Sequence, residues 1–258
     1  MNEKRLSNIM SYMRLHQSAM VNDLCAEFNV SDMTIRRDLV QLEQRNQVVR
    51  FHGGATVCKE NSAESFQIRL RDSPAEKEEI AQTAAEYLRI LTTEQKPKVI
   101  FLSSGSTMYR FAQHISIPLS ATLVTDNVHV AEVLGSNPSY TVISIGGQLL
   151  LPSLNVVGYT AESMIRSFPI DYAFISTSAI DQEGNIYMYN MLESSAFQAI
   201  IETAKNVVLL ADHTKFDRTN VVHLCQLTRK FMVITDSQTP EAVLDRLRQR
   251  GISVISAC

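Results

Sequence analysis

Residues 30–39 read VSDMTIRRDL, and this stretch decides how the first part of the chain folds. Ser31 is a residue type that favours the N-cap of a helix. Apolar side chains then recur at Ile35, Leu39 and Leu42, which share one face of a helix. The opposite face carries Met33, Thr34, Arg37, Gln41 and Gln44, with Arg36 and Asp38 on its flanks. The pattern predicts an amphipathic helix whose outer face either contacts base edges and phosphates or is simply solvated.

Two further helical patterns precede this one. Apolar residues are spaced by three and four positions over residues 6–13 and again over residues 21–28. Residues 29–31, which separate the second pattern from the third, leave room only for a tight turn. Two short helices, a three-residue turn and a third helix follow the plan of a helix-turn-helix.

A hairpin pattern follows the third helix. Residues 48–52 and 55–57 read as strands, and the glycine pair 53–54 lies between them as a turn. A hairpin in this position is typical of a wing. We expect Arg50 and His52 near its tip, where a cation reaches the DNA backbone or the minor groove.

Composition and charge narrow the class of protein. The chain has 258 residues, of which 45% are hydrophobic and 20% charged, so a packed core is expected. The net charge is −3, but residues 1–60 carry a net charge of +1 and the remainder −4. No apolar run reaches the ~20 residues of a membrane span, and the N-terminus lacks the apolar core of a secretory signal. We therefore expect a cytoplasmic protein. The four cysteines form no CxxC pair, so neither a metal site nor a cofactor is predicted.

Beyond a polar linker at residues 58–73, strand and helix patterns alternate. A helix begins at Pro74. The predicted strands are residues 99–102, 122–125, 140–145, 172–175, 207–211, 231–235 and 252–255. The predicted helices between them are residues 108–115, 128–134, 161–168, 192–204 and 242–248. This alternation predicts an α/β domain with a mostly parallel sheet that is covered on both faces.

Polar residues follow five of the predicted strands. They are residues 103–107, 126–127, 146–147, 176–178 and 212–215. Ligands of such folds bind beyond the C-terminal ends of the strands. A small, hydroxyl-rich loop with a glycine that opens a helix, like residues 103–107, presents N–H groups and hydroxyls to an anion. Each set alone is more often a helix cap or a surface lysine, but five sets at one edge favour a binding site.

The sequence resembles one bacterial family along nearly its whole length. Residues 30–39, 42–43 and 50–55 closely resemble the N-terminal signature of the DeoR family of transcriptional regulators. Residues 101–107, 124–127, 146–147, 157–158, 171–175, 190, 193 and 211–216 resemble successive blocks of the DeoR-type sensor domain. The resemblance implies a winged helix-turn-helix that binds operator DNA, and a sensor domain similar in fold to ribose-5-phosphate isomerase and coenzyme A transferases.

The resemblance also implies the residues of two sites. The implied DNA-binding residues are Ser31, Met33, Thr34, Arg36, Arg37, Gln41, Arg50 and His52. The implied effector-binding residues are Ser103, Ser104, Gly105, Ser106, Thr107, Asp126, Asn127, Gly147, Ser176, Asn190, Glu193 and Lys215. The isomerase carries a comparable Gly-Ser-Thr phosphate loop and a comparable acid-Ser/Thr-Lys segment. The implied ligand is therefore a phosphorylated sugar or a related metabolite.

Three positions depart from the family pattern. Ser103 stands where the family usually has Asp, and Asp126 stands where it usually has Asn. Ser176 replaces a usual Gly. The first two changes move a negative charge from one pocket loop to another, and the third adds a side chain to the pocket floor. We expect the ligand class to hold and the ligand itself, or its affinity, to differ.

These features predict a DNA-binding domain at residues 1–57, a linker at 58–73 and a sensor domain at 74–258. The favoured function is an operator-binding regulator that forms a homo-oligomer and responds to a phosphorylated sugar. Repression that the ligand relieves is the commoner mode in the family, so we expect a repressor. Two alternatives remain. One is an isomerase or transferase with Glu193 as general base and Lys215 as its electrostatic partner. The other is an operator-binding protein with a vestigial pocket.

Overall fold

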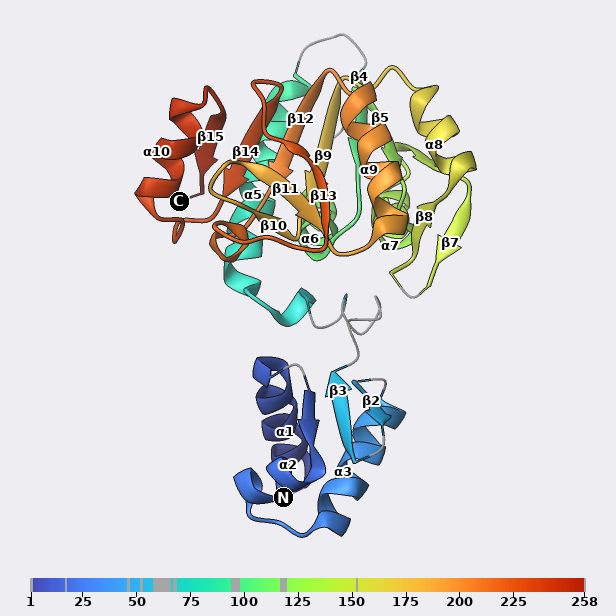
Figure 1. The fold of residues 1–258 in the computed structure, drawn as a ribbon. Coiled ribbons are helices and arrows are strands. Elements are labelled where there is room, and N and C mark those ends of the chain that lie inside the picture. The colour runs from blue at the N-terminus through green and yellow to red at the C-terminus, as the bar shows by residue number, and fades with distance from the viewer. Residues whose placement is uncertain are drawn as a thin grey trace. The chain divides into compact units, whose positions relative to one another are not determined.

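The computed structural model describes residues 2–16, 18–45, 47–51, 53–57, 66, 69–93, 98–116, 120–151 and 153–257. The chain divides into two compact units, Met1–Gln67 and Ile68–Cys258, which Figure 1 shows in blue and in the remaining colours. Among the described residues, no helix combines the length and apolar character that crossing a membrane requires.

The N-terminal unit contains the three predicted helices and the predicted hairpin. Its elements are α1 (Asn2–His16), β1 (Ser18–Met20), α2 (Val21–Phe28), α3 (Asp32–Gln44), β2 (Val48–Phe51) and β3 (Gly54–Val57). The three strands pair antiparallel in the order β1-β3-β2. The predicted apolar stripes meet in one core, where Ile9, Leu24, Ile35 and Leu42 are fully buried. This is the winged helix-turn-helix that the sequence predicts.

One side chain of α3 lies elsewhere than the helical pattern suggests. Asp38, placed above on the flank of the outer face, is only 1% exposed. Its Oδ2 accepts a hydrogen bond from Nε of Arg5 on α1 at 2.5 Å, and its Oδ1 accepts one from Nη2 at 3.1 Å. Arg5 of α1 thus meets Asp38 on this flank of α3, a contact that a wheel drawn for a single helix does not show. Asp38 therefore fixes α3 to α1.

The C-terminal unit is built on a parallel sheet of seven strands. In spatial order they are β15 (Ser253–Ser256), β14 (Phe231–Thr235), β12 (Asn206–Leu210), β9 (Tyr172–Ser176), β4 (Lys98–Leu102), β5 (Ala121–Thr125) and β6 (Thr141–Ser144). One face packs against α5 (Pro74–Leu91), α6 (Ser106–His114) and α7 (Val128–Gly135). The other packs against α8 (Tyr159–Arg166), α9 (Met191–Thr203) and α10 (Glu241–Gln249). The predicted strands and helices thus all form, with ends that differ by one or two residues.

Alternate residues of each strand enter opposite cores. On β4, Ile100 and Leu102 belong to one core cluster and Phe101 to the other. The apolar runs of the strands are continuous because both faces are buried. Because all seven strands run parallel, their C-terminal ends lie at one edge of the sheet, and the polar loops that follow the strands gather there.

The sequence analysis missed the antiparallel parts of this unit. They are the hairpin of β7 (Gln148–Leu150) and β8 (Asn155–Val157), the sheet of β10 (Ala179–Ile180), β11 (Asn185–Met188) and β13 (Val222–Gln226), and the 3₁₀ turn η1 (His213–Lys215). These strands have two to five residues, and one of their pairs, β11 with β13, joins distant segments. Such short segments carry too little periodicity to be distinguished from loops.

Candidate functional site

The outer face of α3 is exposed, as a DNA-reading face must be. Met33 is 81% exposed, and Arg37 is exposed with no ion-pair partner among the described residues. The Arg36 guanidinium contacts Asp32 one turn earlier, Nε to Oδ1 at 2.5 Å. Arg37 is therefore available at once to a base or phosphate, whereas Arg36 must first exchange its carboxylate partner.

Two hydroxyl side chains contact each other at the start of α3. Ser31 occupies the N-cap position with extended backbone, as predicted. Its Oγ lies 2.9 Å from Oγ1 of Thr34 and does not cap a backbone N–H of the first turn. Both side chains thus lie at the N-terminus of α3, the end that enters the groove in helix-turn-helix proteins.

The wing is connected to α3 by one arginine. Nε of Arg50 on β2 donates to Oε2 of Glu43 on α3 at 2.7 Å, and the Arg50 N–H donates to Oε1 at 3.2 Å. These bonds hold the pKa of Glu43 below its ordinary value. The half-buried Gln41 lies one turn before the end of α3. His52, predicted at the wing tip, falls outside the described residues.

In the C-terminal unit, the predicted effector loops follow adjacent strands. Leu102 of β4 lies opposite Thr125 of β5, so Ser103 and Asp126 continue two neighbouring strands in register. Both side chains are buried, and neither Ser103 Oγ nor Asp126 Oδ1 has a hydrogen-bond partner among the described residues. Relative to the family pattern, the carboxylate at position 126 in place of position 103 therefore lies on the loop after the neighbouring strand.

Asp126 is electrostatically unusual. Burial raises the pKa of its carboxyl group to about 7, and repulsion from Glu193 acts in the same direction. The Ser103 hydroxyl favours the ionised form, but the two groups do not meet in a hydrogen bond of normal geometry. A buried carboxyl oxygen that lacks a partner among the described residues, as Asp126 Oδ1 does, is suited to a polar ligand.

The loop before α6 is shaped like an anion site. Gly105 occupies the N-cap with φ 128° and no side-chain cap, so the first-turn N–H groups of α6 are left for another acceptor. Ser104, Ser106 and Thr107 are buried residues, and their hydroxyls take part in none of the hydrogen bonds found among the described residues. Ser176 Oγ donates to the Ser104 carbonyl at 2.8 Å and would overlap a Cβ atom on Gly105.

After β12, which is separated from β4 by β9 in the sheet, η1 presents a lysine. Nζ of Lys215 lies 3.9 Å from Oδ2 of Asp212, which is buried and makes no hydrogen bond among the described residues. Oδ1 of Asp212 accepts from the Thr214 N–H at 3.0 Å and from the Thr214 hydroxyl. Asp212 therefore fixes the turn and keeps the ammonium of Lys215 at the strand edge.

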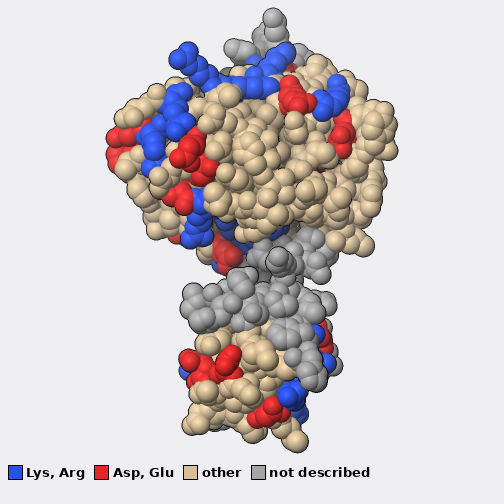
Figure 2. Space-filling view, viewed as in Figure 1, with Lys and Arg blue, Asp and Glu red and all other residues tan. Residues whose placement is uncertain are grey.

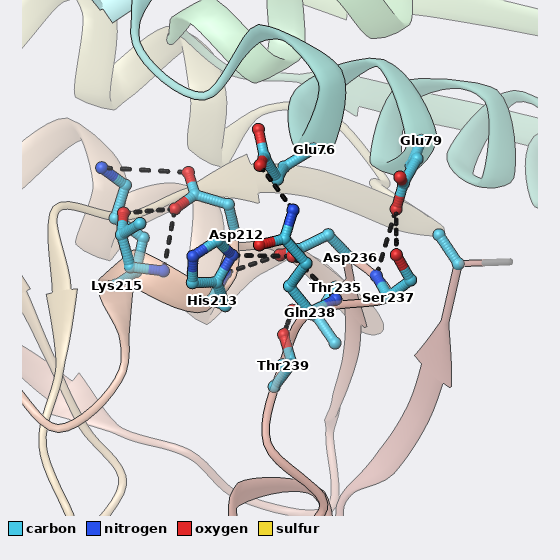
Figure 3. A network of polar contacts seen from close by, with 12 residues as sticks. Glu76, Glu79, Asp212, His213, Lys215, Thr235, Asp236, Ser237, Gln238 and Thr239 are labelled. Carbon is cyan, nitrogen blue, oxygen red and sulfur yellow. Dashed lines mark hydrogen bonds and ion pairs between the residues drawn. The ribbon is translucent and has the colours of Figure 1, made fainter.

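Asp236, which the sequence analysis did not single out, supports the same turn. It follows β14 and is fully buried. Its Oδ1 accepts from the His213 N–H at 2.6 Å, and its Oδ2 lies 2.7 Å from His213 Nδ1 (Figure 3). From α5, Glu76 accepts from Gln238 Nε2 at 2.7 Å, so the loop after β14 connects α5 to η1 (Figure 3).

Lys77 is the second residue that sequence reasoning missed. Its side chain lies on α5 and is 2% exposed. Burial lowers the pKa of its ammonium to about 8, the Asp212 charge raises it, and the Lys215 charge lowers it. Lys77 therefore lies within electrostatic reach of the η1 turn. Its spacing was a usable signal, because Lys77 is in register with the buried Ile80 and Ala84 of the same helix.

The remaining predicted effector-binding residues are Asn127, Glu193, Asn190 and Gly147. Asn127 caps α7 through Val130 N, and its Nδ2 donates to Asn155 Oδ1 at 2.6 Å. Asn155 in turn donates to Oε1 of Glu193 at 2.7 Å. Burial raises the pKa of Glu193, while Asn155 and then the charge of Arg69 lower it. Asn127 thus holds the loop, and Glu193, whose Oε1 accepts from Asn155 and Ser153, has Oε2 without a hydrogen bond among the described residues.

Asn190 and Gly147 complete this side. Oδ1 of Asn190 accepts from Leu192 N at 2.9 Å, which caps α9. A Cβ atom on Gly147 would lie 2.9 Å from the Val157 carbonyl oxygen, so only glycine lets the loop after β6 approach β8. Both residues shape loops at the site. Among the described residues, no group of three or more His, Cys, Asp or Glu side chains is arranged for a metal ion.

Comparison with protein families gives two matches that together span most of the chain. Residues 5–61 match the DeoR-like helix-turn-helix domain, and residues 72–237 match the DeoR C terminal sensor domain. The second match alone covers more than half of the chain.

Individual relatives are similar over nearly their full length. The glycerol-3-phosphate regulon repressor of Escherichia coli K12 is 28% identical over 97% of this chain and 97% of its own. The HTH-type transcriptional repressor CsqR of the same organism is 28% identical over 91% and 88%. Among solved structures, ribose 5-phosphate isomerase A from Neisseria gonorrhoeae is 12% identical with a TM-score of 0.36, over 54% of this chain and 52% of the isomerase.

Proposed function

The chain belongs to the DeoR family of DNA-binding transcriptional regulators, and on this premise we propose that it is a repressor released from its operator by a phosphorylated sugar. The enzyme alternative is excluded, because the family and the matched relatives are transcriptional regulators. We assign DNA binding to residues 1–57, the linker to residues 58–73 and effector binding to residues 74–258.

The observation that carries the proposal is the uncapped start of α6. Its first-turn N–H groups and the hydroxyls of Ser104, Ser106 and Thr107 lack acceptors and donors on the described chain. A phosphate group with close to two negative charges satisfies such donors. Lys215 and Lys77 supply positive charge nearby in a unit whose overall charge is negative.

The sugar part of the ligand needs donors and acceptors of its own. Asp126 and Glu193 have oxygen atoms that face the same edge, and both carboxyl groups have raised pKa values because they are buried. Sugar hydroxyls can donate to a carboxylate or accept from a protonated carboxyl group. The E. coli relative named for the glycerol-3-phosphate regulon supports a small phosphorylated polyol as the class of effector.

DNA binding is assigned to α3 and the wing. Arg37 and Met33 face outward from the first half of α3, and Arg50 on the wing strand β2 is bonded to Glu43 near the end of the same helix. Arg37 is placed to contact a base, with Ser31, Thr34, Arg36, Gln41, Arg50 and His52 contributing to the contact with the groove and the backbone.

A single winged unit covers few base pairs, so paired half-sites and a homo-oligomer are expected. Figure 2 shows a broad face of the C-terminal unit, over β11, β13 and the lower part of α9 in the view, without Lys, Arg, Asp or Glu side chains. Exposed apolar residues of this unit include Leu149, Met191, Leu192 and Val221. An uncharged face suits a twofold contact, because such a contact brings identical surfaces together.

A thermal-shift screen tests the assignment of ligand class. A panel of phosphorylated sugars is compared with the same sugars without phosphate, and each hit is then added to an operator gel shift. A ligand that binds only the folded chain at 100 times its Kd raises stability by about 2.7 kcal/mol. We expect hits among phosphorylated sugars alone, each of which releases DNA. Stabilisation by unphosphorylated sugars only would contradict the proposal, and no hit at all would favour a vestigial pocket.

A further inference from the structure

Lys77 links the η1 turn to the short segment, residues 69–73, that precedes α5. Its Nζ donates to the carbonyl oxygens of Arg69 and Asp72, at 2.6 Å each. The same ammonium interacts with the charges of Asp212 and Lys215 on the other side. One buried cation therefore interacts both with the η1 turn, which carries the proposed phosphate partner Lys215, and with two backbone carbonyls.

A second cation holds the same segment from the neighbouring helix. Nη2 of Arg110 on α6 donates to the carbonyl oxygen of Leu70 at 3.0 Å. Because α6 begins at Ser106, the helix that offers its N-terminus to an anion also carries this contact. Three carbonyls within residues 69–72 are thus held by cations from the two helices that border the site.

The backbone makes a sharp bend at the end of this segment. Ser73 has φ 45°, a left-handed conformation that is uncommon for a residue with a side chain. The Ser73 carbonyl then accepts from the Lys77 N–H at 3.1 Å as α5 begins. Residues 69–73 therefore bend around the Lys77 ammonium, and their position depends on where that ammonium lies.

A bound phosphate competes for this cation. A carbonyl oxygen is a neutral acceptor, whereas a phosphate oxygen carries negative charge and therefore attracts an ammonium more strongly. The competition takes place in a buried setting, where charges interact more strongly than in water. Lys215 already repels Lys77, so an anion between the two lysines would stabilise both.

We propose that Lys77 couples the effector site to the linker: phosphate binding draws its ammonium away from the Arg69 and Asp72 carbonyls and releases residues 69–73. This inference rests on the proposed function, because it requires an anion at the start of α6. Lys77 acts here as a positioning residue, and the change reaches DNA binding through the chain that leads from residue 69 toward the N-terminal unit.

The test is hydrogen exchange of the full-length protein with inorganic phosphate as the probe and chloride at matched ionic strength as the reference. We expect phosphate to slow exchange over residues 104–109 and to speed exchange over residues 69–77 about tenfold. In Lys77→Met, residues 69–77 should exchange rapidly without phosphate and show no further change. Lys205→Met, a matched control at an exposed lysine that pairs with Asp171, should behave like the parent.

The outcomes separate this inference from the proposed function. Protection of residues 104–109 without faster exchange over residues 69–77 overturns the coupling and leaves the effector site intact. Absence of protection at residues 104–109, with phosphate and with every phosphorylated sugar of the screen, overturns both. If Lys77→Met does not fold, the response of the parent protein still decides the question.

Discussion

Two arginines of the DNA-binding unit, Arg36 and Arg50, and two lysines of the proposed effector site, Lys77 and Lys215, differ in burial and in the groups that they contact. Arg36 and Arg50 are about half exposed, and each is bonded to a carboxylate on its own surface. Lys77 is buried, and Lys215 is three-quarters buried beside a carboxylate oxygen that lacks a hydrogen bond. Exposed pairs exchange partners at little energetic cost, whereas buried groups interact strongly. DNA binding should therefore spread over many small contacts, and effector sensing should depend on few residues.

The largest effect is expected at the anion site. Lys215→Ala should abolish the response to effector and leave operator affinity unchanged, because the two sites lie in different units. Gly105→Val should do the same, since φ 128° disfavours a side chain and Cβ would overlap Ser176 Oγ. The measurement is an operator gel shift with and without effector, with Lys205→Ala as control. A normal effector response in Lys215→Ala would break the contrast between the two regions.

The next effect is on stability and concerns Asp126. The folded chain keeps its proton up to about pH 7, and the unfolded chain loses it near pH 4. The folded state thus binds more protons between these values, so stability falls as pH rises from about 4 to about 7. Asp126→Asn should remove this loss and raise stability at pH 8 by at most about 4 kcal/mol, with little change at pH 4.

Asp171→Asn provides a control of opposite sign. Although burial opposes ionisation, hydrogen bonds from Lys205 and the Val99 N–H hold the pKa of Asp171 below its ordinary value. Its contribution to stability is present above the unfolded pKa and is lost as the pH falls, so Asp171→Asn should destabilise the chain at neutral pH. Thermal melts of the parent and both variants, from below pH 4, where Asp171 titrates, to pH 8, above the range where Asp126 titrates, compare the two slopes. Equal slopes for Asp126→Asn and the parent would show that Asp126 is ionised in the folded protein.

Base reading by α3 comes next in size. Arg37→Ala should weaken operator binding by about 1–3 kcal/mol and bind unrelated DNA nearly as before, because Arg37 is free to contact a base. Titrations at matched salt measure both affinities. Arg36→Ala is the matched comparison, since its guanidinium must leave Asp32 first and should discriminate less between sequences. Unchanged operator affinity in Arg37→Ala would mean that α3 docks differently.

The order of strands and helices could be read from the sequence because each has a strong pattern of its own. The run from Val99 to Leu102 is buried on both faces, and α5 carries a stripe from Ile80 to Leu88. Short antiparallel strands such as β10, with two residues, have no such pattern, and their sheet is completed only when β13 pairs with β11 from a distant part of the chain. Local periodicity predicts an element, but it does not predict a strand that tertiary contacts create.

The residues of the candidate site likewise divide into those that a local sequence pattern predicts and those that only tertiary contacts reveal. The gathering of residues 103–107 and 212–215 at one edge follows from a parallel sheet, so the sequence could predict it. The sequence did not reveal that Lys77 and Asp38 are buried, because their burial depends on segments distant along the helix or chain. Residues 69–73 cover Lys77, and α1 covers Asp38. A charged residue in a helix is normally solvated, and only the structure identifies the exceptions.

The smallest effect, and the finest test of the comparison, concerns Arg50. Its guanidinium is bonded to Glu43, so a DNA phosphate must displace that carboxylate before it gains the contact. Arg50→Ala should therefore weaken binding less than about fivefold, equally for operator and unrelated DNA, and reduce the salt slope by about 0.9. Glu43→Gln, which leaves Arg50 without its ionic partner, should tighten binding to both DNAs. In that background Arg50→Ala should cost more than in the parent, because the exchange no longer offsets the phosphate contact. A loss confined to the operator would instead place Arg50 on a base, and the wing would then share the reading role assigned here to α3.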